Sequence, residues 1–296
     1  MDPFQLIEEG KIKRFFRSRK KLTKANLISH ITHRAAGKET LFVEDDDYLF
    51  MLSLMKELSN EYAVTIFAFC LMPNHVHLLL KPDHDNLSEF MRDMCGQYAR
   101  RFNKRYERKG HLFGGPFRQS IVNDDSYLLA ASLYIHLNPV NAGLVSDPGK
   151  YRYSSLMLYT RDEAPRSFVK PDLVLSVLSD KARERKMRYK ELVERGKAVE
   201  AGNVLEDEHV IVRFMASLKD NFPFFTRKLR TTATNMPPEE GVTDFENLLS
   251  SRKPESKKAR KYLVEQLLAR GYTRTQIAEK LNISRKTVFN ILTFRE

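Results

Sequence analysis

The chain has 296 residues, with 50 Lys or Arg against 38 Asp or Glu, which gives a net charge of +12. This excess favours an acidic partner, most often nucleic acid, and the length allows two domains or one domain with a large appendage. No apolar stretch approaches the length of a membrane span, the first residues lack the apolar segment of a signal peptide, and two cysteines do not make a disulfide framework or a zinc ribbon. We therefore expect a cytoplasmic protein.

The first 24 residues predict a basic arm. Lys20 and Lys21 close a run of positive charge that is interrupted by Phe15 and Phe16. Basic side chains mixed with aromatic rings suit phosphate contact combined with base stacking. Residues 26–33 then alternate as a first strand, and acidic residues at 44–47 mark the positive end of a helix that continues to about Tyr62.

A β-hairpin follows the first helix. Two short apolar runs, residues 64–71 and 78–80, flank the turn Met72-Pro73-Asn74. Side chains two positions apart on a strand point to one face, so His75 and His77 project together. Two imidazoles on one rigid face are a natural pair of metal ligands, although the motif is also compatible with a solvated strand face.

The remaining elements complete an α+β pattern. Residues 87–106 predict a second long helix and residues 117–122 a strand. A third helix is expected to follow a cap at Asn123 or Asp124 and to run to Asn138, because Pro139 ends it. The order β-α-β-β-α-β-α indicates a ferredoxin-like antiparallel sheet with helices on one face. An all-α C-terminal region with a helix-turn-helix is expected to follow.

The third helix carries a candidate nucleophile and a candidate ligand. Tyr134 and Asn138 are four positions apart and share one helix face. An amide oxygen beside two imidazoles favours Mg²⁺ or Mn²⁺. A tyrosine phenol, whose pKa is about 10, is a weak nucleophile until a bound cation stabilises charge on a phosphodiester. Attack would form a phosphotyrosine, and Tyr127, seven residues earlier, is the rival nucleophile.

The C-terminal segment predicts a second DNA-binding unit. Helices are expected within residues 171–199 and 206–221, and a polar linker near residues 230–256. Residues 251–296 hold twelve Lys or Arg and four Asp or Glu, an excess of +8. Residues 257–270 predict a helix, and residues 272–292 fit a helix-turn-helix in which Asn282 takes the turn. The second helix would offer a major groove Arg285, Lys286, Thr287 and Asn290.

Further DNA contacts are expected from basic residues and one histidine near the first strand, the second helix and the last strand. They are His33, Arg34, Arg100, Arg101, Lys104, Arg105 and Arg118. His30 cannot share a strand face with His33, and we interpret it as an ordinary polar residue.

Three stretches together resemble a known superfamily. Met72-Pro-Asn-His-Val-His77, His111-Leu-Phe113 and Tyr134-Ile-His-Leu-Asn-Pro-Val140 resemble the HUH endonucleases, and within them the single-tyrosine transposases associated with repetitive extragenic palindromes (REP). The resemblance implies a ferredoxin-like fold that nicks single-stranded DNA beside hairpins through a 5′-phosphotyrosine, leaving a free 3′-OH.

The resemblance also assigns roles by position. His75 and His77 would bind metal, Asn138 would complete the ligand shell, and Tyr134 would attack. The segment Phe113-Gly-Gly-Pro-Phe117 departs from the pattern, because a bulkier polar residue is expected there. This departure bears on local DNA contacts.

Four regions follow from these patterns: a basic arm (1–24), an HUH tyrosine nuclease or transposase domain (25–165), a helical extension and linker (166–250), and a helix-turn-helix module (251–296). The expected partners are single-stranded hairpin DNA and, through the last module, duplex DNA, for a monomer or homodimer. Two alternatives remain. One is a domesticated DNA-binding regulator that does not cleave; the other is a relaxase or replication initiator, although these often carry two tyrosines or a third histidine.

Overall fold

The structure is a computed structural model that describes residues 21, 23–37, 39–122, 125–199, 210–221, 264 and 273–293. Most of the basic arm with Lys20, the caps proposed at Asn123 and Asp124, the linker, and nearly all of the helix expected at 257–270 lie outside these residues. In the described part of the chain, no helix has the length and apolar character needed to cross a membrane.

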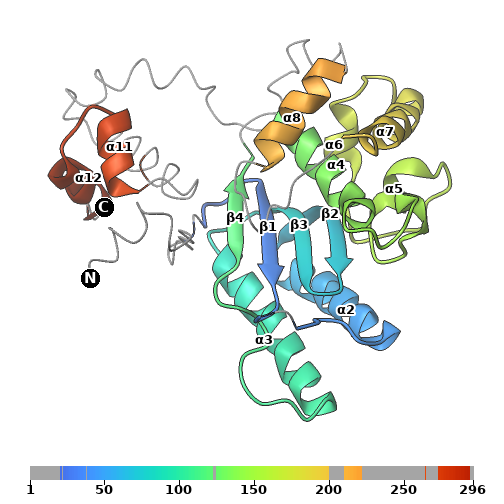
Figure 1. Ribbon diagram of the computed structural model, residues 1–296, viewed down its shortest axis with the longest axis horizontal. Helices are drawn as coiled ribbons and strands as arrows, with labels where there is room; N and C mark the ends of the chain where they lie inside the picture. Colours follow the sequence, from blue (N-terminus) through green and yellow to red (C-terminus); the bar gives the residue numbers. More distant parts are fainter. Residues whose placement is uncertain are drawn as a thin grey trace.

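A four-stranded antiparallel sheet forms the centre of the fold (Figure 1). Its strands lie in the order β2-β3-β1-β4, which is the ferredoxin-like order and confirms the predicted fold class. The elements in chain order are β1 (Ser29–Arg34), α2 (Asp45–Glu61), β2 (Val64–Met72), β3 (His75–Pro82), α3 (Leu87–Arg105), β4 (Arg118–Ile121) and α4 (Asp125–Asn141).

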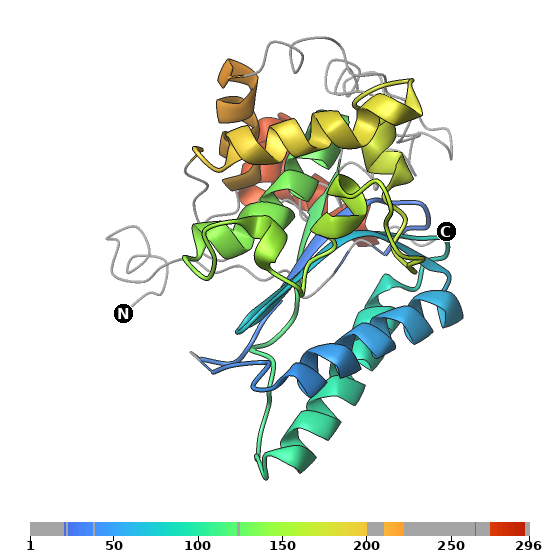
Figure 2. The ribbon, with the colours of Figure 1, turned by 90° about the vertical axis from the view of Figure 1, so that its right-hand side faces the viewer.

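Helices cover both faces of this sheet (Figure 2), whereas the sequence predicted helices on one face. Figure 2 shows the sheet nearly edge-on, with α2 and α3 on one side and α4 on the other. Beyond α4 come a 3₁₀ turn (Pro148–Lys150) and the helices α5 (Leu156–Thr160), α6 (Asp172–Ser176), α7 (Ala182–Gly196) and α8 (Val210–Asn221). These later helices bury their apolar side chains in the same core as the sheet.

The third helix is longer than the sequence predicts. Proline at position 139 was expected to end it, but α4 continues to Asn141. Proline removes only its own N–H donor, and the backbone N–H of Ala142 still donates to the Asn138 carbonyl at 2.9 Å. The helix therefore runs three residues beyond its predicted last residue, Asn138, and the prediction that Pro139 ends it is wrong.

The unusual loop before β4 packs against the end of β1. A Cβ atom on Gly114 would lie 2.9 Å from the backbone oxygen of Ala35, so only glycine allows this approach. Gly115 has φ 99°, and its carbonyl accepts a hydrogen bond from His33 Nε2 at 2.7 Å. The two glycines thus fit the loop to the strand.

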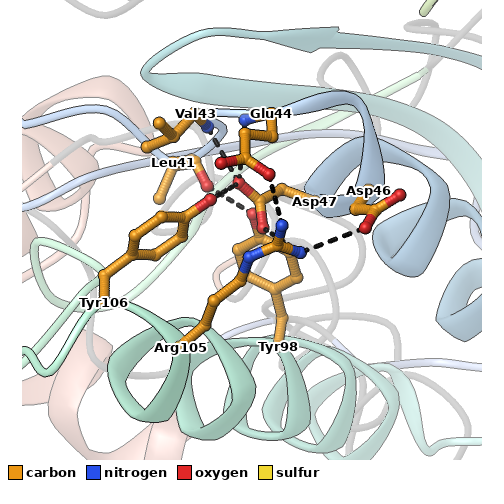
Figure 3. A network of polar contacts seen from close by, with 8 residues as sticks. All are labelled: Leu41, Val43, Glu44, Asp46, Asp47, Tyr98, Arg105 and Tyr106. Atoms are coloured by element: carbon orange, nitrogen blue, oxygen red, sulfur yellow. Dashed lines mark hydrogen bonds and ion pairs between the residues drawn. The ribbon is translucent and has the colours of Figure 1, made fainter.

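A polar network ties the start of α2 to the end of α3 (Figure 3). The buried carboxylate of Asp47 accepts hydrogen bonds from the backbone N–H groups of Val43 and Glu44 at 2.9 and 3.1 Å and from the Tyr106 hydroxyl at 2.8 Å. Arg105 pairs with Glu44, and with Asp46 and Asp47 at 3.4 and 3.9 Å. The network therefore caps the start of α2 and fixes α2 to α3.

The C-terminal unit is a compact pair of helices. It consists of α11 (Arg274–Lys280) and α12 (Arg285–Thr293), with Asn282 at φ 50° in the turn, as predicted. Ile277, Leu281 and Val288 form its core. Thr273 caps α11, and Ser284 Oγ accepts from the Thr287 N–H at 3.0 Å to cap α12. This arrangement confirms the helix-turn-helix.

Asp47→Ala should lower the free energy of unfolding by about 2–3 kcal/mol, because two backbone donors and one hydroxyl lose a buried ionic acceptor. Asp46→Ala is the matched control. Its carboxylate is exposed and, within the described part of the chain, makes the 3.4 Å ion pair with Arg105, so its loss should cost less than about 1 kcal/mol. Urea unfolding of both variants measures the difference, and equal losses would show that the network does not stabilise the fold.

Candidate active site

One face of the sheet gathers the polar side chains of two neighbouring strands. In the antiparallel register of β1 and β3, Thr32 lies opposite His77 and Arg34 lies opposite His75. Directly paired residues share a face, as do residues two positions apart. His30 therefore joins these four on the face that α4 covers.

The helix α4 brings its own polar groups to this face. Asn138 Nδ2 lies 3.2 Å from His77 Nε2. The Tyr134 ring stands edge-on to the His77 ring with 5.8 Å between centroids, and the rings of His75 and His77 are 4.8 Å apart. The structure therefore brings together the four residues that the sequence singled out for chemistry.

The hydrogen bonds fix how both histidines present their nitrogens. An amide nitrogen can only donate, so His77 Nε2 accepts from Asn138 with its lone pair. The Asn74 side-chain oxygen can only accept, so His75 donates from Nδ1 at 2.6 Å and keeps its own lone pair on Nε2. Both rings therefore hold the Nε2 lone pair that a metal ligand needs.

Burial keeps these imidazoles neutral. Desolvation lowers the pKa of His75 to about 4, although a hydrogen bond with Asn138 that favours the protonated ring opposes this shift, and the positive charge of Arg34 lowers the pKa further. Desolvation, with smaller effects of His75 and His30, holds the pKa of His77 well below its ordinary value. Neutral imidazole is the form that binds metal.

These residues fit a divalent cation, although none of the candidate ligands carries a negative charge. Among the described residues, no group of three or more His, Cys, Asp or Glu is arranged to hold a metal. The candidate set instead combines two imidazoles with the Asn138 amide. The amide nitrogen is the atom that lies 3.2 Å from His77 Nε2, so the amide oxygen would ligate a cation only after the amide plane rotates. The set contains no negative charge, so a phosphate would have to supply it.

The catalytic candidate is enclosed. Tyr134 is 2% exposed, and its ring packs edge-on against Phe214 of α8 with 6.1 Å between centroids. Helix α8 lies along α4 (Figure 1). The contact with Phe214 therefore contributes to the burial of Tyr134. Sequence periodicity gave no signal for this contact, because it depends on tertiary packing.

A second polar network holds α4 in place. His136 Nδ1 and Nε2 lie 2.7 Å from the Tyr189 hydroxyl of α7 and 2.8 Å from Ser155 Oγ. Ser155 Oγ in turn donates to the Phe69 carbonyl of β2. His136 is thus a structural link between α4, α7 and the sheet, and burial lowers its pKa to about 3.

Two basic residues of the sheet lie near the site. Arg34 is opposite His75, and its buried Nε has no hydrogen-bond partner among the described residues. Arg118 is opposite Thr32 and shares the same face. Lys21 is farther out, with its Nζ 5.0 Å from the centre of the Phe117 ring. Arg34 and Arg118 are therefore the expected DNA contacts that geometry places best.

Two further expected DNA contacts are engaged with neighbours inside the domain, and their role in DNA binding stays a prediction. His33 faces the opposite side of the sheet, where its ring stacks on Phe113 at 4.4 Å and both nitrogens have partners, Cys95 Sγ and the Gly115 carbonyl. Arg105 is held by the ion pairs of the α2 cap. Both side chains serve the fold, since each is occupied by its own neighbours.

The other basic residues of α3 also lie on the far side of the sheet from Tyr134. Arg100, Arg101 and Lys104 are exposed, and the Arg101 guanidinium lies 4.3 Å from the centre of the Phe50 ring. DNA bound at these residues would have to pass around the domain to reach the histidines. Their role in DNA binding stays a prediction.

Three of the four residues of α12 that were expected to contact a major groove have exposed side chains. Arg285, Lys286 and Asn290 are exposed. Thr287 is only half-exposed, and its hydroxyl pairs with Ser284 Oγ at 2.8 Å, so it belongs to the helix cap. Phe289, which the sequence analysis did not single out, is 49% exposed between these polar residues.

Two segments of the chain match known protein families, and one named protein is similar to part of it. Residues 23–138 match the family described as "Transposase IS200 like", and residues 252–293 match the "Helix-turn-helix domain of resolvase". A Haemophilus influenzae protein named "Putative REP-associated tyrosine transposase" is 29% identical over 115 residues, which cover 35% of this chain and 65% of that protein. The match thus spans just under two thirds of the relative.

One solved structure is also similar. It is described as a REP-associated tyrosine transposase bound to a REP hairpin, and it matches with a TM-score of 0.43 and 16% identity over 52% of this chain and 93% of that chain. This likeness is too distant to carry an argument about function.

The buried histidines make stability depend on pH. The pKa values of His30, His75 and His136 are lowered from 6.5 to about 4, 4 and 3. Below pH 6.5 these histidines bind protons in the unfolded chain but stay neutral in the folded chain. The free energy of unfolding therefore falls as the pH drops from 6.5 toward 4, by about 1.4 kcal/mol per pH unit for each histidine. Urea unfolding in metal-free buffer between pH 7.5 and 5 measures this slope. A free energy of unfolding that stays constant over this range would contradict the buried neutral state.

Proposed function

From the premise that residues 23–138 form an IS200-like transposase domain, we propose that this chain is a metal-dependent nuclease and strand transferase for single-stranded DNA. Its substrate is a DNA strand next to a hairpin, and its intermediate is a 5′-phosphotyrosine on Tyr134. The observation that supports this most is the meeting of Tyr134 and Asn138 with His75 and His77 on one face of the sheet. Transposition or the mobilisation of REP elements is the process that such chemistry serves.

Different residues of the site would bind the metal and the phosphate. His75, His77 and Asn138 would hold Mg²⁺ or Mn²⁺, which when bound stabilises charge on the phosphodiester and orients it. Arg34, whose Nε lacks a partner among the described residues, is placed to donate to a phosphate oxygen beside His75. Burial removes water from around these groups and so strengthens their interaction with a phosphate.

In the chemical step, the Tyr134 oxygen bonds to phosphorus and the bond from phosphorus to the 3′ oxygen breaks. The phenol gives up its proton and the departing oxygen gains one, which yields a free 3′-OH and a 5′-phosphate linked to tyrosine. Because the energy of the phosphodiester is kept in this link, a second 3′-OH can reverse the step and join a new strand. Helix α4 positions both Tyr134 and Asn138, one turn apart.

A regulator that binds DNA without cleaving it is the second candidate. The enclosure of Tyr134 beneath Phe214 favours it, because a permanently closed site would bind hairpins and leave them intact. The intact set of ligands and nucleophile favours the enzyme. A relaxase or initiator is less well supported, since the match lies in the transposase family.

Tyr134→Phe should abolish the covalent protein–DNA adduct and leave hairpin affinity within about twofold, because only the phenol oxygen is lost. The measurement uses labelled single-stranded hairpin DNA with Mn²⁺ and denaturing gels. Tyr127→Phe is the matched control on the same helix and should keep the adduct. An adduct that persists in Tyr134→Phe and disappears in Tyr127→Phe would assign the nucleophile to Tyr127 instead.

His77→Ala should weaken Mn²⁺ binding by at least tenfold and abolish cleavage, because one of two imidazole ligands is removed. His84→Ala, an exposed histidine in the turn after β3, should bind Mn²⁺ as the wild type does. Since the ligand set carries no charge, bound single-stranded DNA should also tighten Mn²⁺ binding. Calorimetric titration with and without DNA measures both effects, and equal Mn²⁺ affinity in the two variants would exclude the site.

The double substitution Arg285→Ala and Lys286→Ala should weaken duplex binding and reduce the log–log salt slope by about 2, since each phosphate contact contributes roughly −0.9. Hairpin nicking should remain, because the two cations lie outside the nuclease domain. Fluorescence anisotropy over a salt series measures the slope. Unchanged duplex affinity would indicate that the helix-turn-helix contacts another protein.

A further inference from the structure

The histidine of β1 that faces the site lies directly beside a candidate metal ligand. His30 Nε2 is 3.1 Å from His77 Nδ1, and the two rings stack with centroids 5.3 Å apart. The His30 ring also meets the Tyr134 ring edge-on at 6.3 Å. His30 is 1% exposed, so sequence reasoning was wrong to treat it as an ordinary polar residue.

The direction of the hydrogen bond between these rings follows from Asn138. Because His77 Nε2 accepts from the amide nitrogen, the proton of a neutral His77 ring must be on Nδ1. That proton has two acceptors within reach, His30 Nε2 at 3.1 Å and Thr32 Oγ1 at 3.3 Å. The shorter contact makes His30 the principal acceptor, so the lone pair of His30 is on Nε2.

We propose that His30 is a positioning residue that fixes the tautomer and ring plane of His77, so that the Nε2 lone pair of His77 faces the cation site. This proposal rests on the proposed function, which makes His77 a ligand. A hydrogen bond to the second nitrogen of a ligating imidazole sets its orientation and basicity, and loss of such partners typically weakens metal binding about 10–100-fold.

The arrangement is unusual in using a neutral imidazole where metal sites often use a carboxylate or a backbone carbonyl. A neutral acceptor adds no charge to the buried face. The stacking of His30 on His77 and its contact with Tyr134 also link nucleophile and ligand through one side chain. His30 acts through His77 and does not itself contact the substrate.

Four substitutions separate positioning from packing. His30→Leu and His30→Phe fill the space but remove the acceptor, whereas His30→Gln keeps an acceptor oxygen. Thr32→Val removes only the more distant acceptor. Thermal unfolding without metal checks that each variant folds, and His30→Phe replaces His30→Leu if the latter does not.

Calorimetric titration with Mn²⁺ alone should show affinity reduced 10–100-fold in His30→Leu or His30→Phe and restored to within about threefold of wild type in His30→Gln. Thr32→Val should change it by less than about threefold. Wild-type affinity in folded His30→Leu or His30→Phe would overturn the proposal, and so would equal weakening in His30→Gln, which would indicate packing alone.

A second readout does not depend on the metal. Nitrogen chemical shifts of labelled imidazole rings in the metal-free protein should show His77 protonated on Nδ1, and this preference should weaken in His30→Leu or His30→Phe. Protonation of His77 on Nε2 would overturn the inference. Wild-type protein that shows the Nδ1 proton but binds no Mn²⁺ would instead refute the metal site of the proposed function, and the role of His30 toward a ligand would fall with it.

Discussion

The contact between His77 on β3 and Asn138 on α4 is the one on which the site depends. These residues are 61 positions apart, and their 3.2 Å contact joins the sheet to the helix that carries Tyr134. If α4 rotated or slid by one residue, Asn138 would leave His77 and Tyr134 would leave the histidine face. The links from His136 to Tyr189 and Ser155 hold the helix against both movements.

Burial of the site removes water from its histidines, and this desolvation opposes their protonation. Four histidines lie buried between α4 and the sheet, and each loses the proton that water would allow it at slightly acidic pH. Under the proposed function, the same desolvation would prepare the site, because neutral imidazoles offer lone pairs and an environment without water strengthens the attraction between a phosphate and a cation. The contact of Phe214 with Tyr134 contributes to the burial of that side chain.

Local periodicity was enough to predict the main chemical groups. Spacing of two on a strand placed His75 and His77 on one face, and spacing of four on a helix did the same for Tyr134 and Asn138. The order of strands and helices likewise predicted the sheet. The end of the helix expected at Pro139 was wrong, because the steric rule for proline describes a preference that the packing of α4 overrides.

What sequence could not provide was the pairing of distant segments. The neighbour of His77 on β1 is set by the strand register, so His30 looked ordinary until β1 and β3 were aligned. The ion pairs of Arg105 had no signal in the sequence, because its acidic partners lie about 60 residues earlier, at the start of α2 (Figure 3). Phe214 belongs to a helix whose packing on α4 has no local signature.

A crystal of the Tyr134→Phe protein with a single-stranded hairpin and Mn²⁺, measured by anomalous scattering, tests the central claim most directly. The account predicts one manganese peak bonded to Nε2 of both His75 and His77 and to the Asn138 side-chain oxygen, at about 2 Å from each ligand, with a phosphate oxygen of the DNA as a further ligand. A manganese peak elsewhere, or DNA bound with Phe214 still covering residue 134 and no metal between the histidines, would contradict it.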